Sequence, residues 1–576
     1  MNFDSICTAL EAREIDYVFG VPGTQTLGLF DALRGSGLRF VLASHELGAA
    51  FMASGHYRAS GRPAVVATIG GPGFTNALTG IAEARLDSIP LLHLVSAPAT
   101  RPGERFQLQA IDQTGIAGPI VKGCFRLERG RDPAPIIDAA LDLAFEGEPG
   151  PVLVEFDADP AGDIDGGAGA EAVHESSEEP LARQSDAGQE GASFESLRSR
   201  WNAAERPVLL VGQGAAAGAP ALQRIVETGG VAVVTTPSAR GILPEDHPAA
   251  MGFDVLRGGL EAVNRLFERS DLILAIGCKL GHNGSAGFRL HLPERTLVRV
   301  DRSPEVLSAN FPASLAIRAD AAAALEFLAS GSGTDRGSGG WTEEELGSYR
   351  EQIRQPNPAA ADPAVAGAVN GRASGFFSWL RQALPRETIL VTDSGLHQVV
   401  ARRWFEVLAP RGLILPSDFQ SMGFGIPAGI GARLAAPDRP VAVLVGDGGL
   451  LMSGLEITTA VREKLPLLVI VFNDGALNQI RWQQLRDSGH PFGVELARLE
   501  IETFARAIGA DYLAFDGTQE AGRLARELGE DCPTILEVQV GDSWSMRSQA
   551  AGAKLKSVAR SVRDSATGGG SARRSK

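Results

Sequence analysis

Short apolar runs of strand length alternate with longer helix-like segments along most of the chain. The clearest case is late in the sequence, where residues 441–445 lead directly into a Gly-Asp-Gly turn at Asp447. A second apolar run, residues 467–472, ends close to Asp474, and residues 454–464 between the two runs have a helical pattern. This order predicts a strand–helix–strand unit with parallel strands. The two acidic tips then fall at the carboxyl ends of the strands, where α/β sheets bind ligands.

The same alternation recurs in two earlier regions of the chain. Their apolar runs end in glycine, proline or small polar residues, which is typical of strands that lead into loops. These expected strands cover residues 17–20, 39–43, 64–69, 91–95 and 151–156, and then 207–211, 231–235, 271–276 and 296–300. Because strands that alternate with helices form parallel sheets, we predict an α/β fold with three doubly wound parallel-sheet domains.

Three segments differ in composition from these regions. Residues 161–199 begin with glycine, alanine, serine and many acids, a mixture that buries too little apolar surface to fold, so we expect an acidic flexible linker. Residues 330–369 begin with SGSGTDRGSGG and are expected to form a second linker. Residues 549–576 are rich in basic side chains and are expected to form a disordered tail. The three domains are then expected at residues 1–160, 200–329 and 370–548.

Composition excludes several classes of protein. A chain of 576 residues is too long for one core and predicts about three or four domains at ~150 residues each. The net charge of −15 argues against a nucleic-acid partner, because phosphate binding needs a basic surface. The four cysteines lack metal or redox spacing, and no uncharged apolar run approaches the ~20 residues of a membrane helix. Without a signal-peptide pattern, we expect a cytoplasmic protein with no membrane partner.

Asp447 and Asp474 are candidate ligands of one metal ion. Taken singly, the Gly-Asp and Asn-Asp pairs are as consistent with ordinary turns as with a site. Taken together, two carboxylates at neighbouring strand ends can hold a hard divalent cation against a phosphate, which is the sparse protein ligand set that Mg²⁺ accepts. The glycines around Asp447 let the backbone approach such a ligand closely.

A Gly-Asp-Gly turn that is followed, after one helix and the next strand, by Asn-Asp resembles the motif of thiamine-diphosphate enzymes. Three further stretches occur in family order, namely GVPGTQ at 20–25, GGPGFTN at 70–76 and LDSIPLL at 86–92. The chain therefore resembles the acetolactate synthase and pyruvate oxidase branch of that family. The resemblance implies a pyrimidine-binding, a central and a diphosphate-binding domain. It covers about residues 1–160, 200–330 and 370–545.

The resemblance assigns the catalytic acid to Glu46, within SHELGAAFMASGHYRASG. A glutamate at a helix start is, by itself, more often a cap or a solvated residue. In the family this carboxyl lies beside N1′ of the aminopyrimidine and stabilises the imino tautomer, whose 4′-nitrogen removes the C2 proton of the thiazolium. Met422 matches the bulky apolar residue that acts as a wedge under the thiazolium, although a methionine is usually a core residue.

The implied cofactors are thiamine diphosphate and Mg²⁺. Asp447, Asp474 and the carbonyl of Ala476 match the metal ligands. Asp474 stands where asparagine is commoner in the family, which adds a charge without removing an oxygen ligand. The remaining positions that match cofactor contacts are Ser394, Gly395, His397, Gly446, Gly448 and Gly449.

Five residues match substrate positions of the same family. Gln109, in LQAIDQTGI, matches a glutamine near the reacting carbon, and Thr24 and Gln25 occupy the loop after Pro22 and Gly23. Asn283 stands where acetolactate synthases carry an arginine that receives the second keto acid. Gln483 stands where a tryptophan lines the acceptor pocket. Loss of the bidentate arginine clamp would weaken a 2-oxoacid acceptor.

The resemblance implies decarboxylation of a small-molecule 2-oxoacid, with acyl-carbanion transfer to an acceptor as in acetolactate synthase. A non-ligating decarboxylase, an aldehyde lyase and a cofactor-binding non-catalytic paralogue stay open as alternatives. The arginines that contribute to the FAD site of flavin-containing relatives are largely missing here, which argues against FAD. The family implies a homodimer or homotetramer with active sites at the subunit interface.

Overall fold

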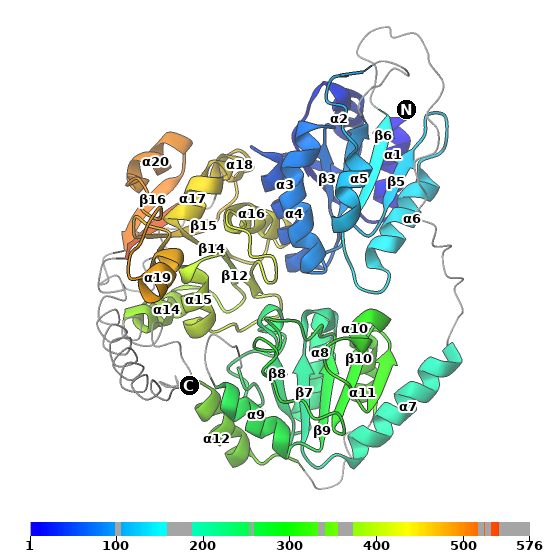
Figure 1. The fold of residues 1–576 in the computed structure, drawn as a ribbon, viewed down its shortest axis with the longest axis vertical. Coiled ribbons are helices and arrows are strands. Elements are labelled where there is room, and N and C mark those ends of the chain that lie inside the picture. Colours follow the sequence, from blue (N-terminus) through cyan, green and yellow to red (C-terminus); the bar gives the residue numbers. More distant parts are fainter. Residues whose placement is uncertain are drawn as a thin grey trace, which may run out of the picture.

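The computed structural model describes residues 2–97, 105–157, 187–252, 254, 259–331, 340–354, 372–515, 524 and 531–540. These residues form three α/β domains, each built on one sheet (Figure 1). Every strand pair in the three sheets is parallel, and apolar clusters cover both faces of each sheet. The predicted fold class is therefore confirmed.

The first domain has a six-stranded sheet in the order β2-β1-β3-β4-β6-β5. Its strands are β1 Tyr17–Gly20, β2 Arg39–Leu42, β3 Val65–Thr68, β4 Leu92–Ala97, β5 Cys124–Leu127 and β6 Val152–Asp157. Its helices are α1 Phe3–Ala12, η1 Thr24–Thr26, α2 Leu27–Gly35, α3 Glu46–Ser60, α4 Pro72–Leu86, α5 Gln113–Ala117, η2 Gly118–Ile120 and α6 Ala134–Phe145. The strand β5 was absent from the predicted set because its half-buried pattern, CFRL, lacks a continuous apolar run.

The second domain has a five-stranded sheet in the order β11-β10-β9-β7-β8. Its strands are β7 Pro207–Val211, β8 Ala232–Thr235, β9 Leu272–Ile276, β10 Leu297–Asp301 and β11 Leu315–Arg318. Its helices are α7 Ala187–Ala203, η3 Gln213–Gly218, α8 Ala219–Glu227, η4 Pro237–Ala239, α9 Leu260–Arg269, α10 Pro304–Ser308, α11 Ala321–Ser330 and α12 Glu343–Arg354. The edge strand β11 was not predicted, since only Ile317 of its residues LAIR is buried.

The third domain has a six-stranded sheet in the order β13-β12-β14-β15-β17-β16. Its strands are β12 Ile389–Thr392, β13 Leu413–Ile414, β14 Val441–Gly446, β15 Leu468–Asn473, β16 Asp511–Phe515 and β17 Thr534–Gln539. Its helices are α14 Arg372–Ala383, α15 Leu396–Trp404, α16 Gly425–Ala435, α17 Asp447–Ser453, η5 Gly454–Glu456, α18 Ile457–Arg462, α19 Asn478–Asp487 and α20 Ile501–Ile508. The predicted unit β14–α17/α18–β15 lies at its centre.

The predicted linkers overlap two helices. Residues 158–186 lie outside the described residues, and they include most of the predicted linker 161–199. The remainder of this linker, from Ala187 on, belongs to α7. The predicted linker 330–369 contains α12, which packs against α9. Three buried side chains, Leu346, Tyr349 and Ile353, hold α12 in place, and their spacing is helical although the segment is strongly charged. The predicted tail, 549–576, lies outside the described residues.

The first and third domains pack together through α3 and α16. A Cβ on Gly55 would overlap the carbonyl oxygen of Ala428, and a Cβ on Gly431 would overlap that of Met52. Only glycine allows backbones to approach this closely. The two helices run antiparallel, because Met52 contacts Gly431 whereas Gly55, later in α3, contacts Ala428, which is earlier in α16. One apolar cluster consequently spans both domains.

Buried ion pairs join the second and third domains. Arg402, on α15, donates hydrogen bonds of 2.9 Å to both carboxylate oxygens of Asp254. Arg240 donates to Glu245 at 2.6 and 2.9 Å and to the carbonyl of Phe405 at 2.6 Å. Because a buried charge is tolerated only with a well-placed partner, these pairs fix α15 to the second domain.

Candidate active site

Asp447 lies at the centre of the site predicted in the third domain. It follows β14, and the parallel register places the end of β14 beside the end of β15, with Gly446 opposite Phe472. Its Oδ1 accepts the N–H of Gly448 at 2.8 Å, and its Oδ2 accepts the N–H groups of Gly475 at 2.6 Å and Asp474 at 3.2 Å. The carboxylate of Asp447 therefore ties together the two turns that the sequence pattern singled out.

Asp474 is the second carboxylate at this point. Its Oδ1 accepts the N–H of Ala476 at 3.2 Å, and its Oδ2 accepts Nδ2 of Asn478 at 2.7 Å. Burial raises the pKa of Asp474 to about 6; the Asn478 hydrogen bond opposes this rise, and the charge of Asp447 adds to it. Burial also raises the pKa of Asp447. Two partly buried carboxylates that repel each other are stabilised by a cation between them.

The donor set fits a metal that takes oxygen ligands and needs a further anion. Among the described residues, no group of three or more histidine, cysteine, aspartate or glutamate side chains could hold a metal ion. Asp447 and Asp474 would therefore share the ion with the Ala476 carbonyl and with oxygens of a bound ligand. Mg²⁺ commonly binds through one or two carboxylates together with substrate phosphates.

His397 and the glycines near it form the side of the site expected to face a diphosphate. A Cβ on Gly446 would lie 3.2 Å from Nδ1 of His397, and Gly395 has a φ of 149°, which favours glycine. The Nε2 atom of His397 is buried with no hydrogen-bond partner among the described residues. Because burial lowers the pKa of His397 to about 4, its ring is neutral near pH 7 and has one N–H to donate.

Met422 lies against the Gly-Asp-Gly turn. A Cβ on Gly448 would be 3.3 Å from Cε of Met422, so a side chain at position 448 would displace the methionine. Asp393, completely buried, accepts the N–H of Gly423 at 3.0 Å through Oδ2 and that of Ser394 at 2.6 Å through Oδ1. Burial raises the pKa of Asp393 to about 7, and its backbone hydrogen bonds oppose the rise. Asp393 was not among the site residues predicted from the sequence, although it directly precedes Ser394 at a strand end.

Glu46, in the first domain, opens α3 and is half-buried. Its Oε2 accepts Nδ2 of Asn76 at 3.0 Å, and its Oε1 lies 3.3 Å from the position of a Cβ on Gly73. Both neighbours belong to the first turns of α4, within the GGPGFTN stretch. Asn76 therefore orients the glutamate, a role that the sequence analysis did not assign.

The predicted substrate residues of the first domain come together. Nε2 of Gln25 donates to Oε1 of Gln109 at 2.7 Å, and Oε1 of Gln25 accepts Oγ of Ser96 at 2.8 Å and the N–H of Gly70 at 3.2 Å. Thr24 begins η1 beside them and is exposed. Ser96, at the end of β4, was missed because it is a small residue inside an apolar strand.

Asn283 and Gln483, the other two predicted substrate residues, lie outside the first domain. Nδ2 of Asn283 donates to the carbonyl of Ser417 and, at 3.5 Å, to Oδ1 of Asp418. This side chain therefore bridges the second and third domains. Gln483 is on α19, which has no buried residue among its ten.

Within one chain, Glu46 and Met422 are held apart. Glu46 contacts Gly73 at the start of α4, whereas the residue before Met422, Ser421, contacts Glu83 near the end of that helix. The two contacts are separated by about 15 Å along α4 at ~1.5 Å per residue. Within a single chain, Glu46, the predicted catalytic acid, therefore does not lie beside Met422, the predicted wedge.

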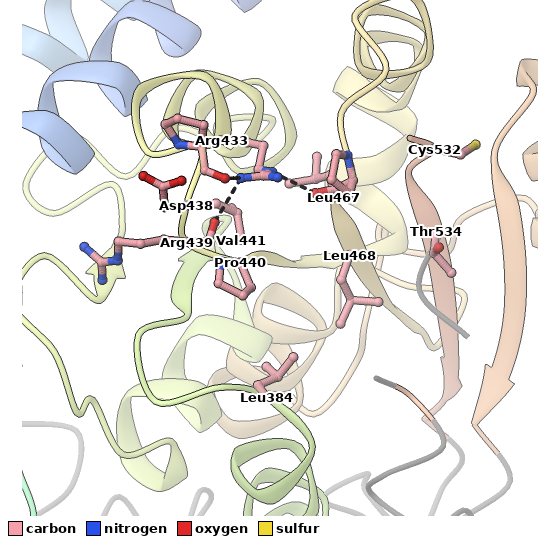
Figure 2. Close-up of a pocket in the computed structure, with 12 residues that line it drawn as sticks. Leu384, Arg433, Asp438, Arg439, Pro440, Val441, Leu467, Leu468, Cys532 and Thr534 are labelled. Carbon is pink, nitrogen blue, oxygen red and sulfur yellow. Dashed lines mark hydrogen bonds between the residues drawn. The ribbon is translucent and has the colours of Figure 1, made fainter. Parts of the chain in front are cut away.

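A separate cavity of about 240 Å³ lies at the opposite edge of the same sheet (Figure 2). It is lined by residues at the starts of β14 and β15, including Val441 and Leu468, whereas Asp447 and Asp474 follow the ends of these strands. The Arg433 guanidinium beside it donates to the carbonyls of Pro466 at 3.2 Å and Ala436 at 3.3 Å. Since backbone carbonyls already engage this cation, the cavity is not assigned to a ligand.

Comparisons with known proteins agree with this arrangement. Three models of the thiamine pyrophosphate enzymes match the chain, the N-terminal TPP binding domain at residues 3–116, the central domain at 195–328 and the C-terminal TPP binding domain at 393–538. The chain belongs to the thiamine pyrophosphate enzyme family.

Its relatives place it in the acetolactate synthase-like group of that family. It is 31% identical to the acetolactate synthase isozyme 1 large subunit of Escherichia coli over 482 residues, which cover 82% of each chain. It is 32% identical to a probable 2-ketoarginine decarboxylase of Pseudomonas aeruginosa over 543 residues, which cover 91% of each chain. In the part of the chain that the structure describes, no helix is long and apolar enough to cross a membrane.

Proposed function

We propose that this protein decarboxylates a small 2-oxoacid with the help of thiamine diphosphate and Mg²⁺ and transfers the acyl unit to an acceptor, as an acetolactate synthase does. The observation that carries the proposal is the pair Asp447 and Asp474, whose carboxylates meet at adjacent strand ends beside His397 and Met422. Their chemistry suits a metal-bound diphosphate rather than a metal alone.

Each group near the pair has a role in holding the cofactor. Asp447, Asp474 and the Ala476 carbonyl would bind Mg²⁺. The diphosphate would be held by Ser394, Gly395 and His397 on one side and by Gly446, Gly448 and Gly449 on the other. The buried Nε2 of His397 has no partner among the described residues, and in the tautomer that carries the proton there it would donate to an anionic oxygen. When bound, thiamine diphosphate supplies the electron sink that makes decarboxylation possible.

Glu46 would exchange a proton with N1′ of the aminopyrimidine. The Asn76 hydrogen bond to Oε2 leaves Oε1 available and fixes the direction of the carboxyl. Gln25 donates to Gln109, so the two side chains offer a preorganised polar surface to the 2-oxoacid. Thr24 lies on the exposed side of that surface.

The active site requires two copies of the chain. Glu46 and Met422 of one copy lie at opposite ends of α4, so the glutamate must serve the diphosphate-binding domain of a second copy. The exposed apolar side chains Leu451, Met452 and Leu455, on α17 and η5, are 51%, 61% and 65% exposed and offer a surface for that copy. A homodimer or a homotetramer satisfies this requirement.

Release of the decarboxylated product as an aldehyde is a second candidate. The position of the acceptor-binding arginine in acetolactate synthases holds Asn283 here, and its amide is committed to Ser417 and Asp418. It therefore brings no cation to a second keto acid. The similarity to a probable 2-ketoarginine decarboxylase points the same way and suggests 5-guanidino-2-oxopentanoate as a test substrate.

A product assay distinguishes the two candidates. Protein reconstituted with Mg²⁺ and thiamine diphosphate should consume pyruvate, or another 2-oxoacid in a panel, and form a 2-hydroxy-3-oxoacid detectable by NMR. Aldehyde as the sole product from every substrate would overturn acyl transfer and retain decarboxylation. If the protein neither consumes a 2-oxoacid nor speeds exchange of the C2 proton of bound thiamine diphosphate, it is a non-catalytic paralogue that only binds the cofactor.

A further inference from the structure

Met422 belongs to a segment where all three domains meet. This segment, residues 415–423, connects β13 to α16 and is here named the wedge loop. From the second domain, Asn283 donates to Ser417, and Oγ of Ser238 donates to Oγ of Ser417 at 3.1 Å. The wedge loop is therefore positioned by groups far from it in the sequence.

The first domain holds the beginning of the wedge loop. The two oxygens of Asp87 accept the N–H groups of Ser417 and Asp418, each at 2.9 Å. Arg58 pairs with Asp87 at 2.6 Å and donates to the carbonyl of Leu415 at 3.0 Å. Arg58 and Asp87 are both almost completely buried, so this attachment lies between the domains rather than on a solvated surface.

Glu83 holds the end of the wedge loop. Its Oε2 accepts the N–H of Ser421, the residue before Met422, at 3.0 Å. Glu83 lies on α4 with no exposed surface, and its Oε1 is buried without a hydrogen-bond partner among the described residues. A carboxyl with one unpaired buried oxygen is costly to keep, so packing alone does not account for it.

The two N–H groups that flank Met422 are both held by buried carboxyls. On one side Glu83 of the first domain accepts from Ser421, and on the other side Asp393 of the third domain accepts from Gly423. The methionine is thus fixed between two domains through its own backbone neighbours. Small displacements at such a point alter the geometry of anything packed on the side chain.

We infer that Glu83 is a positioning residue for Met422, through which the first domain sets the wedge of the third domain. The inference rests on the proposed function for the role of Met422, but the contact itself does not. Loss of the Glu83 acceptor should free the end of the wedge loop while the Asp87 and Asn283 contacts retain its beginning.

Hydrogen exchange in the cofactor-free full-length protein tests the contact directly. Glu83→Met keeps the length of the side chain and removes the acceptor, so exchange at the Ser421 amide should become about tenfold faster. Glu83→Gln keeps an acceptor oxygen and should exchange like the wild type. Equal exchange in the wild type and Glu83→Met would overturn the inference.

Kinetics and a matched control test the consequence for Met422. Glu463→Ala removes a different contact between the same two domains, the 2.9 Å pair with Arg39, and should leave exchange in the wedge loop and kcat unchanged. Glu83→Met should lower kcat about tenfold with a smaller change in KM, and Glu83→Gln should restore it. If the exchange result holds and kcat is unchanged, Glu83 orders the wedge loop without positioning the wedge, and the inference fails while the proposed function stands.

The dependence of stability on pH supplies an independent readout. Burial, with the Asp87 charge second, raises the pKa of Glu83 from 4.5 to about 7, whereas Arg58 and Ser421 oppose the rise. The charges of Asp87 and of Asp418, in the wedge loop, also repel each other. The folded state therefore keeps a proton that the unfolded chain loses, so the stabilising contribution of Glu83 is complete below pH 4.5 and is lost as the pH rises through 7.

Glu83→Gln cannot ionise and should gain stability relative to the wild type as the pH rises. The difference in Tm between this variant and the wild type should shift in favour of the variant between pH 5 and pH 8, measured by calorimetry. A constant difference over that range would show that Glu83 is not held in this buried, acid-rich contact.

Discussion

Replacing Glu46 with glutamine is expected to lower kcat about a thousandfold, the midpoint of the 10²–10⁴ that a positioned acid or base contributes. Glutamine fits the same space and can still accept from Asn76, but it cannot exchange a proton with the aminopyrimidine. Steady-state kinetics with the 2-oxoacid that the wild type consumes would measure the loss.

Cofactor binding should survive the same substitution. Calorimetric titration with thiamine diphosphate and Mg²⁺ should give a Kd within about threefold of the wild type, because only one hydrogen-bonding atom changes. Asn76→Ala is the matched variant, since it removes the partner and keeps the carboxyl, and should lower kcat by much less. Wild-type turnover in Glu46→Gln would remove Glu46 from the mechanism and leave the metal assignment intact.

Replacing Asp447 with alanine should strongly weaken cofactor binding. The side chain accepts three backbone N–H groups from the two turns and would provide one of the two carboxylates for Mg²⁺. Loss of a partner that merely orients a metal ligand typically costs 10–100-fold in affinity, so loss of the ligand itself should weaken Mg²⁺-dependent binding by more than about 100-fold. Calorimetry with thiamine diphosphate at fixed Mg²⁺ measures this.

Asp474→Asn is the matched control for Asp447→Ala. It removes one of the two repelling charges, keeps an oxygen for the metal, and installs the residue that is commoner at this position in the family. Affinity should stay within about tenfold of the wild type. If Asp447→Ala binds thiamine diphosphate as tightly as the wild type at every Mg²⁺ concentration, these carboxylates are turn residues and the metal site is elsewhere.

The meeting of Asp447 and Asp474 at neighbouring strand ends was predictable because its determinants are local. Strands of continuous apolar residues, such as those before Asp447 and Asp474, are recognisable without knowledge of their neighbours, and parallel pairing brings their carboxyl ends together. The resemblance to a family then selected Glu46 and Met422. Edge strands such as β5 and β11 were missed because exposure breaks the apolar run that marks a strand.

Asp393, Asn76 and Glu83 were not predicted from the sequence for a different reason. Each acts through a backbone or side-chain group that is distant in sequence or carries no distinctive pattern, and a single acidic residue on a helix such as Glu83 is indistinguishable from a solvated one. In the folded protein it is completely buried and contacts Ser421 of the third domain. The helix α12 is similar, since its charged composition hides the three apolar residues that anchor it.

The sequence by itself determined that this chain folds into three parallel-sheet domains, and its motifs predicted Asp447 and Asp474 as metal ligands and Glu46 as the catalytic acid. These properties depend on periodicity and on short motifs, both of which are local. Only the tertiary structure decided that Glu46 and Met422 of one chain lie at opposite ends of α4, that Asn283 is committed to the wedge loop, and that carboxyls from two domains hold the neighbours of Met422. Those relationships depend on how the three domains pack together, and that packing is set by contacts between residues hundreds of positions apart.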